Sequence, residues 1–278
     1  MQKIVIPKTQ LRTSRLGFGT ASLHHLVRSR NRKALLAAAL DSGITHFDTA
    51  PMYGERMAER ELGRFLGSAR NRVTIATKIG FSPNGIFERF PPILYAHRAL
   101  GRIGRLILPR RWDYRPRSLT LEDVEQNLSR SLKALRTDWI DLLLVHEPQV
   151  TDVGALLELA EWLEGQRVSG RVRYLGLAGS ASNCVEVARQ VPGLFDILQV
   201  EDSLAVHEAD AVIEFGWPLQ ITFGYLRGAA ITQSSIDAQV IIKAALARNA
   251  LGMVLVSSRN PERLKILTSL VDMDRSQR

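Results

Sequence analysis

Three ionisable side chains lie where apolar, strand-like runs of the sequence give way to loops. Asp48 ends one run, Tyr53 follows in the loop, and Lys78 ends the next run. A tyrosine hydroxyl titrates at about 10 in water, too high for an efficient acid or base at neutral pH. A lysine beside it, anchored by a carboxylate, would stabilise the phenolate and lower that pKa. Each residue alone fits a structural ion pair or a turn, but together they predict a proton-donating site.

The rest of the chain alternates between short apolar runs and stretches with helical periodicity. The runs end near eight positions: Gly19, Asp48, Lys78, His146, Ala178, Glu201, Phe223 and Ser258. The helical stretches are 31–42, 57–67, 120–136, 152–168, 182–190, 207–215, 236–249 and 260–270. Short apolar strands between helices are typical of a parallel sheet buried on both faces.

Eight strand–helix units predict one α/β domain, a (β/α)₈ TIM barrel over residues 1–278. A doubly wound sheet is the alternative, but no strand is followed by a Gly-x-Gly-x-x-Gly turn. In a barrel the carboxyl ends of the strands meet at one mouth. Polar or aromatic side chains from six strands would then gather there, which favours a catalytic site: Asp48, Lys78, His146, Gln199, Phe223 and Ser258.

Most of the net charge lies in one segment. The chain carries +9, and residues 80–117 hold eight arginines against two acidic residues. Because the excess is local, it argues against a nucleic-acid partner. The segment follows the strand that ends at Lys78 and is much longer than an ordinary loop between strand and helix. It predicts an insertion at the mouth, either a lid over an anionic substrate or a basic face for a membrane or acidic partner, with the lid favoured.

The cysteine content, the length of the apolar runs and the spacing of possible metal ligands restrict the cellular location and the cofactors that we expect. Cys184 is the single cysteine, so no intramolecular disulfide can form, and a reducing, cytoplasmic location is expected. No apolar run is long enough to span a bilayer, and no ligand spacing indicates a metal site. The oligomeric state is not predicted.

Five motifs make the chain similar to the aldo-keto reductases over nearly its whole length. They are residues 47–54 (Phe-Asp-Thr-Ala-x-x-Tyr-Gly), Thr77-Lys78, 138–146, the strand holding Gln199, and 257–264. Residues 50–63 lean toward the bacterial aldose-dehydrogenase-like branch. The resemblance implies a TIM barrel and transfer of hydride between a nicotinamide cofactor and a carbonyl or sugar substrate. It assigns the catalytic roles to Asp48, Tyr53, Lys78 and His146. Tyr53 would protonate the alkoxide, Lys78 held by Asp48 would lower the Tyr53 pKa, and His146 would orient the carbonyl.

The resemblance also implies a set of cofactor contacts, with NADPH or NADP preferred and NAD as the alternative. Gln199 would hold the carboxamide and Phe223 would stack on the nicotinamide. The other expected contacts are Gly19, Thr20, Gly224, Leu226, Gly228, Ser257, Ser258, Arg259 and Arg263. The preference depends on Arg259 and Arg263, whose guanidinium groups match a 2′-phosphate; they could equally be a solvated helix start. Substrate contacts are expected from His24, Trp112 and Tyr114.

The chain departs from the family pattern at four positions. Ala178 and Gly179 replace a Ser-Asn pair that contacts the carboxamide, Ser257 replaces a lysine, and Leu267 replaces an asparagine. Two alternatives to a reductase therefore stay open. One is a regulatory or scaffold subunit that binds cofactor with little turnover, and the other is an aldose dehydrogenase with the same site residues.

Overall fold

Eight parallel strands close into a barrel in the computed structural model, which describes residues 1–90, 92–96, 117–227 and 237–273. Each strand pairs with the next along the chain, and the last pairs with the first, so the predicted TIM barrel is confirmed. The strands are β3 (Leu16–Gly19), β4 (His46–Asp48), β5 (Thr74–Ile79), β6 (Ile140–His146), β7 (Val172–Gly179), β8 (Ile197–Glu201), β9 (Ile221–Phe223) and β10 (Met253–Val256).

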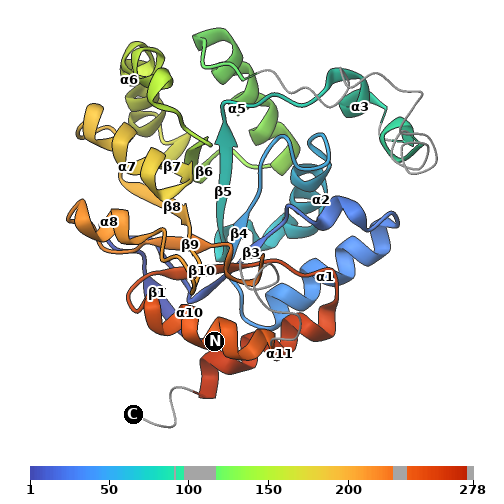
Figure 1. The fold of residues 1–278 in the computed structure, drawn as a ribbon. Coiled ribbons are helices and arrows are strands. Elements are labelled where there is room, and N and C mark those ends of the chain that lie inside the picture. The colour runs from blue at the N-terminus through green and yellow to red at the C-terminus, as the bar shows by residue number, and fades with distance from the viewer. Residues whose placement is uncertain (91, 97–116, 228–236, 274–278) are drawn as a thin grey trace, which may run out of the picture.

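Helices surround the strands on the outside (Figure 1). They are α1 (Ser29–Asp41), α2 (Met57–Leu66), α5 (Leu121–Leu135), α6 (Val153–Val168), α7 (Ala181–Gln190), α8 (Asp210–Glu214), α10 (Ala238–Arg248) and α11 (Pro261–Met273). Short 3₁₀ turns occupy Leu23–His25, Gly67–Arg72 and Val150–Asp152. None of the described helices is long and apolar enough to cross a membrane.

The strands are buried because their side chains face either the barrel interior or the ring of helices. Every residue of β5 and β6 is buried, which explains their continuous apolar runs in the sequence. The register brings the carboxyl ends to one level: Ala178 pairs with His146 on one side and with Gln199 on the other. Residues that end neighbouring strands therefore converge on one mouth.

Two features differ from the sequence prediction. An antiparallel hairpin of β1 (Lys3–Val5) and β2 (Arg12–Ser14) precedes the barrel, and its Ile6 and Leu11 pack with barrel-interior residues such as Ile221. Helix α8 begins at Asp210 and not at 207, because His207 has a φ of 60°, which no helical residue adopts.

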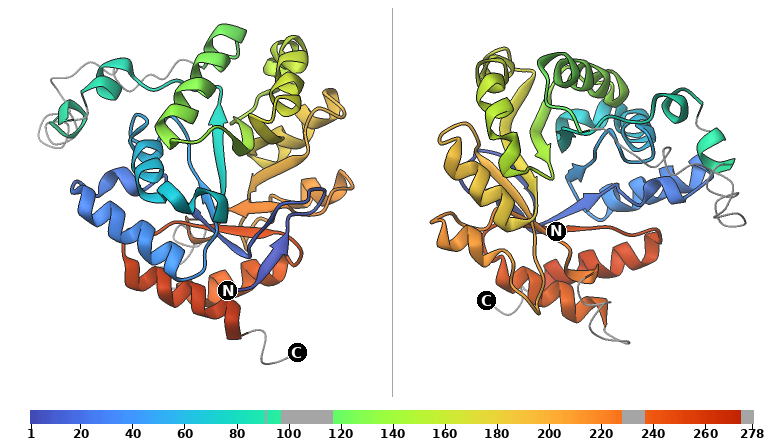
Figure 2. Two further views of the ribbon diagram at one scale, coloured as in Figure 1. Left: turned by 180° about the vertical axis from the view of Figure 1, so that it is seen from behind. Right: turned by 45° about the horizontal axis from the view of Figure 1, so that its top comes forward.

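The two ends of the insertion meet at the mouth. Phe81 forms a β-bridge with Arg117, and the backbone N–H of Ser118 donates to the carbonyl of Gly80 at 2.9 Å. Between them, α3 (Gly85–Arg89) lies at the outer edge of the molecule, beyond α2 (Figures 1 and 2). Glu88 of α3 forms an ion pair with Arg56 at 2.8 Å. Helix α3 is thus attached to the outside of the helix ring, while the two ends of the insertion lie at the mouth.

Candidate active site

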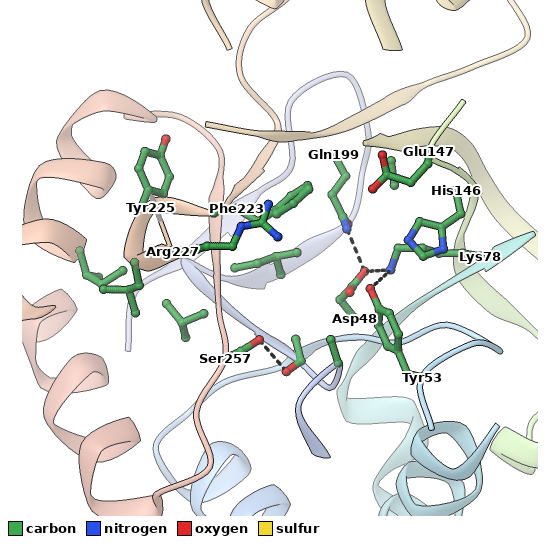
Figure 3. A pocket seen from close by; sticks show the side chains of 18 residues that line it. Asp48, Tyr53, Lys78, His146, Glu147, Gln199, Phe223, Tyr225, Arg227 and Ser257 are labelled. Atoms are coloured by element: carbon green, nitrogen blue, oxygen red, sulfur yellow. Dashed lines mark hydrogen bonds and ion pairs between the residues drawn. The ribbon is translucent and has the colours of Figure 1, made fainter. Parts of the chain in front are cut away.

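A cavity of about 530 Å³ opens at the carboxyl ends of the strands, a size typical of small-molecule sites (Figure 3). Its lining comes from strands around the whole barrel and from the loops that follow them. The lining residues are Gly19, Ala21, Asp48, Tyr53, Lys78, His146, Glu147, Ala178, Gln199, Phe223, Gly224, Tyr225, Leu226, Arg227, Ile242, Leu255, Val256 and Ser257. All four residues predicted to be catalytic line this one cavity.

Lys78 joins Asp48 and Tyr53 in a buried hydrogen-bonded group. Its Nζ donates to Asp48 Oδ1 at 2.6 Å, to the Thr49 carbonyl at 2.9 Å and to the Tyr53 hydroxyl at 3.4 Å. These three bonds use all three N–H donors of the ammonium group, so its position is fixed. Because the Tyr53 oxygen accepts from Lys78, the hydroxyl proton of Tyr53 points away from Lys78.

The pKa of Tyr53 is set by two opposing effects. Burial raises the pKa of Tyr53, and the positive charge of Lys78 lowers it, but burial prevails. Burial alone would lower the pKa of Lys78, yet the charge of Asp48, followed by Tyr53, raises it. Lys78 therefore acts on Tyr53 in the expected direction without bringing its pKa below the ordinary value. In the protein without ligand, Tyr53 is a neutral phenol at physiological pH.

His146 ends β6 beside Tyr53. Its ring meets the Tyr53 ring edge-on, with centroids 6.0 Å apart and planes at 83°. On its other side it meets Phe81, at 5.7 Å and 88°. Arg117 donates to the His146 carbonyl at 2.5 Å and pairs with Asp152. The root of the insertion therefore packs behind His146, while none of the described insertion residues lines the cavity.

Only one of the two polar atoms of the Gln199 side-chain amide has a hydrogen-bond partner among the described residues. Its Nε2 donates to Asp48 Oδ1 at 3.0 Å, whereas its buried Oε1 has no hydrogen-bond partner among the described residues. The amide cannot be turned round, because its oxygen would then face the Asp48 carboxylate. A buried acceptor without a partner is costly, so a ligand with an N–H donor fits here.

The loop after β9 lies on the same side of the cavity as Gln199. Phe223 is half-buried at the end of the strand, and Gly224 follows with a φ of 102°, a conformation that favours glycine. A Cβ at 224 would also come within 3.0 Å of the Glu201 side chain. Across the cavity Ser257 donates from Oγ to the Gly19 carbonyl at 2.9 Å (Figure 3). Gly228 lies outside the described residues.

Four other predicted cofactor contacts do not line the cavity. Thr20 is fully buried and donates from Oγ1 to the Asp48 carbonyl at 3.0 Å, so it supports β4 from behind. Ser258 Oγ accepts from the backbone of Asn260 just before α11. Arg259 and Arg263 are exposed near the start of α11 and form no ion pair with a described residue.

His24 stacks on His25 with centroids 4.1 Å apart. It packs against Gly54, one residue from Tyr53, where an added Cβ would come within 2.4 Å of the His24 Cβ. Its position is therefore beside the cavity, not in its lining. Trp112 and Tyr114, the other two residues predicted to contact substrate, lie outside the described residues.

The structure places two of the residues that depart from the family pattern, Ala178 and Leu267. Ala178 lines the cavity next to Gln199, where it can offer no side-chain hydrogen bond. Leu267 is buried in the hydrophobic core beneath α11, 1% exposed, and so faces away from any ligand. The carboxamide contacts that the Ser-Asn pair would make are thus absent from β7.

Sequence reasoning missed two charged lining residues, Glu147 and Arg227. Glu147 directly follows His146, and Arg227 lies between Leu226 and Gly228, so adjacency to predicted site residues was the available signal. Arg227 pairs with Glu201 at the end of β8.

The sequence of residues 15–215 matches the model of the aldo/keto reductase family. A D-threo-aldose 1-dehydrogenase from a Pseudomonas species is 32% identical over 206 residues, which are 72% of this chain and 60% of that protein. An NADP(+) aldo-keto reductase from Schizosaccharomyces pombe is 29% identical over 186 residues, 63% of this chain and 45% of that protein. The chain thus spans about half of the length of these curated relatives.

Solved structures share the fold at low sequence identity. The crystal structure described as an aldo-keto reductase from Pseudomonas aeruginosa has a TM-score of 0.72 and 22% identity, covering 97% of this chain and 93% of that one. An aldo-keto reductase from Klebsiella pneumoniae in complex with NADPH has a TM-score of 0.67 and 16% identity, covering 98% of this chain and 90% of that one.

Proposed function

Because the chain belongs to the aldo/keto reductase family, we propose that it transfers hydride between NADPH or NADP⁺ and a small carbonyl or alcohol substrate bound in the cavity. The observation that carries the proposal is the group formed by Asp48, Lys78 and Tyr53 at the edge of that cavity. A buried ion pair that holds a protonated phenol in a fixed position lets that phenol donate its proton to a substrate at one defined place.

The side of the cavity near β8 and β9 fits a nicotinamide. Gln199 Oε1 would accept from the carboxamide N–H, which gives this buried atom the partner it lacks. The half-buried Phe223 ring offers a face for stacking, and Arg227 offers positive charge for the pyrophosphate. When bound, the reduced cofactor supplies the hydride.

Tyr53 would act as the general acid in reduction. Its hydroxyl proton points away from Lys78, and the substrate carbonyl oxygen would take it as negative charge develops there. Lys78 would then stabilise the phenolate left on Tyr53, and Asp48 keeps Lys78 charged. In the oxidation direction the same phenolate would take the proton from the alcohol.

His146 would orient the carbonyl. It lies across from Tyr53, so a carbonyl oxygen between the two rings would receive hydrogen bonds from both side chains. Phe81 and the Arg117 contact to the backbone fix the histidine from behind. Two donors held in place before the substrate arrives stabilise the oxyanion without reorganisation.

NADPH would be preferred through Arg259 and Arg263. Both guanidinium groups are exposed near the start of α11, where backbone N–H groups also favour a phosphate. The 32% identical aldose dehydrogenase favours sugar oxidation as the second candidate activity, which uses the same side chains.

The decisive experiment measures cofactor binding and turnover separately. Protein fluorescence quenching gives the Kd of NADPH and NADH, and cofactor absorbance gives the turnover of aldehydes, ketones, polyols and aldoses in both directions. We expect binding of NADPH and turnover of at least one carbonyl or sugar. Binding without turnover across the whole panel would instead identify a cofactor-binding regulatory or scaffold subunit.

A further inference from the structure

Glu147 places a carboxylate in the cavity beside the histidine that would orient the substrate carbonyl. It follows His146 directly, and in Figure 3 its carboxylate faces the space between His146 and Gln199. Its backbone N–H donates to the Ala178 carbonyl at 2.6 Å, which ties the residue to the end of β7.

Two backbone features direct this side chain. Glu147 has a φ of 49°, a left-handed conformation that is strained for any residue other than glycine, asparagine or aspartate. Gly179 provides the space, because a Cβ at 179 would lie 3.0 Å from Glu147 Oε2 and 3.1 Å from its Cα. The chain therefore accepts a strained backbone at 147 and omits a side chain at 179, and the carboxylate fits into the cavity as a result.

Glu147 stands outside the ion pairs that its charged neighbours form. Asp48 pairs with Lys78, Arg227 pairs with Glu201, and Arg117 pairs with Asp152. Glu147 forms no ion pair with any described residue, and its carboxylate accepts no hydrogen bond from one. Partial burial, and then the negative charge of Glu201, raise the pKa of Glu147, and the positive charges of Arg117, Arg227 and Lys78 oppose this shift without cancelling it.

From this geometry we propose that Glu147 selects neutral hydroxylated substrates, by accepting a hydrogen bond from a hydroxyl group next to the reacting carbonyl and by repelling anionic substrates. The inference rests on the proposed reductase function and adds its substrate class. Glu147 is exposed to the cavity, so a substrate hydroxyl would donate to its carboxylate in place of water, while a carboxylate or phosphate on the substrate would meet like charge there.

The test compares three small aldehydes: glyceraldehyde with hydroxyls, propanal without them, and succinate semialdehyde with a negative charge. Each is assayed for kcat/KM with NADPH in the wild type and in the Glu147→Ala and Glu147→Gln variants. Glu214→Gln is the matched control, because it removes the same charge from an exposed residue of α8 that does not line the cavity.

We expect the wild type to prefer glyceraldehyde to propanal by about tenfold or more, the effect of one hydrogen bond to a charged group. Glu147→Ala should remove that preference, because kcat/KM for glyceraldehyde should fall about tenfold more than kcat/KM for propanal. Glu147→Gln, which keeps the size and an acceptor oxygen, should raise kcat/KM for succinate semialdehyde by about tenfold, since like-charge repulsion is lost. Glu214→Gln should change none of these ratios.

Equal losses on glyceraldehyde and propanal in both variants would show that Glu147 only supports the fold, and would overturn the inference while the reductase function stands. A wild type that does not prefer glyceraldehyde to propanal, or one that prefers succinate semialdehyde to both, overturns it as well. If no aldehyde is turned over by the wild type, the proposed function itself fails, and the inference with it. Circular dichroism of each variant checks that the barrel is folded.

Discussion

The two sides of the cavity differ in how completely their polar groups are satisfied. On the β4–β6 side, Lys78 uses all three N–H donors within the protein and holds Asp48 and Tyr53 in place. On the β8–β10 side, Gln199 keeps a buried oxygen without a described partner, and Arg263 is exposed without an ion pair to any described residue. The group of Lys78, Asp48 and Tyr53 is thus held by bonds within the protein, whereas the buried oxygen of Gln199 gains a partner from a ligand.

This difference predicts that substitutions on the two sides separate chemistry from binding. A change on the β4–β6 side removes a group that acts on the reacting atoms and leaves the cofactor surface intact. A change on the β8–β10 side removes a contact to the cofactor and leaves the bonds of Lys78 to Asp48 and Tyr53 in place, although Gln199 also donates to Asp48.

The largest effect is expected for Tyr53→Phe. Losing the general acid should lower carbonyl turnover by about two to four orders of magnitude, while the Kd for NADPH stays within about twofold. Steady-state kinetics and fluorescence quenching measure the two quantities. Substantial turnover in this variant would disprove the catalytic assignment, and a large loss of cofactor affinity would show that the two sides are not separable.

Acid should also destabilise the folded protein through a buried histidine of β4. His46, at the start of β4, is fully buried, and burial lowers its pKa to about 4. The folded state therefore keeps His46 neutral where the unfolded chain, with a pKa of about 6.5, binds a proton. Its contribution to stability is present above pH 6.5 and is lost as the pH falls toward 4, by about 3 kcal/mol in total.

Urea unfolding between pH 7 and pH 4 measures this loss. In His46→Asn, whose side-chain amide can still form a hydrogen bond with Thr74 Oγ1, the free energy of unfolding should fall less steeply with acid. Identical slopes in the wild type and the variant would mean that His46 does not titrate in the folded protein as its burial implies.

The strands and the residues that end them could be predicted from the sequence, because they follow from the periodicity of apolar residues. Features that depend on the backbone conformation of one residue or on its depth of burial could not. Strand ends such as Lys78 and His146 follow from apolar runs, and the barrel then brings them together. The side-chain direction of Glu147 depends on one positive φ, and such an angle has no signature in a glutamate. The net pKa shift of Tyr53 depends on the depth of burial, which becomes known only when the cavity is described.

A tenfold effect on binding is expected for Gln199→Met. The methionine side chain keeps the length of glutamine, but its thioether cannot accept a strong hydrogen bond from a carboxamide. The Kd for the cofactor should therefore rise by about tenfold. Turnover at saturating cofactor should fall much less than in Tyr53→Phe. Gln190→Met, an exposed residue at the end of α7, is the matched control and should leave the Kd unchanged. An unaltered Kd in Gln199→Met would remove the main argument for nicotinamide on this side.

The smallest effect is expected at the exposed end of the β8–β10 side. Arg263→Ala should weaken NADPH binding by about fivefold, the value of a solvent-exposed charge contact, and leave NADH binding unchanged, because only NADPH carries the 2′-phosphate. Added salt should reduce the difference between the two cofactors, as it screens exposed charges. Lys265→Ala, which removes a neighbouring cation of α11 that already pairs with Glu262, serves as the control and should affect neither cofactor. Equal affinity for NADPH and NADH in the wild type, or equal weakening by both substitutions, would mean that Arg263 is only solvated and that cofactor choice is set elsewhere in the chain.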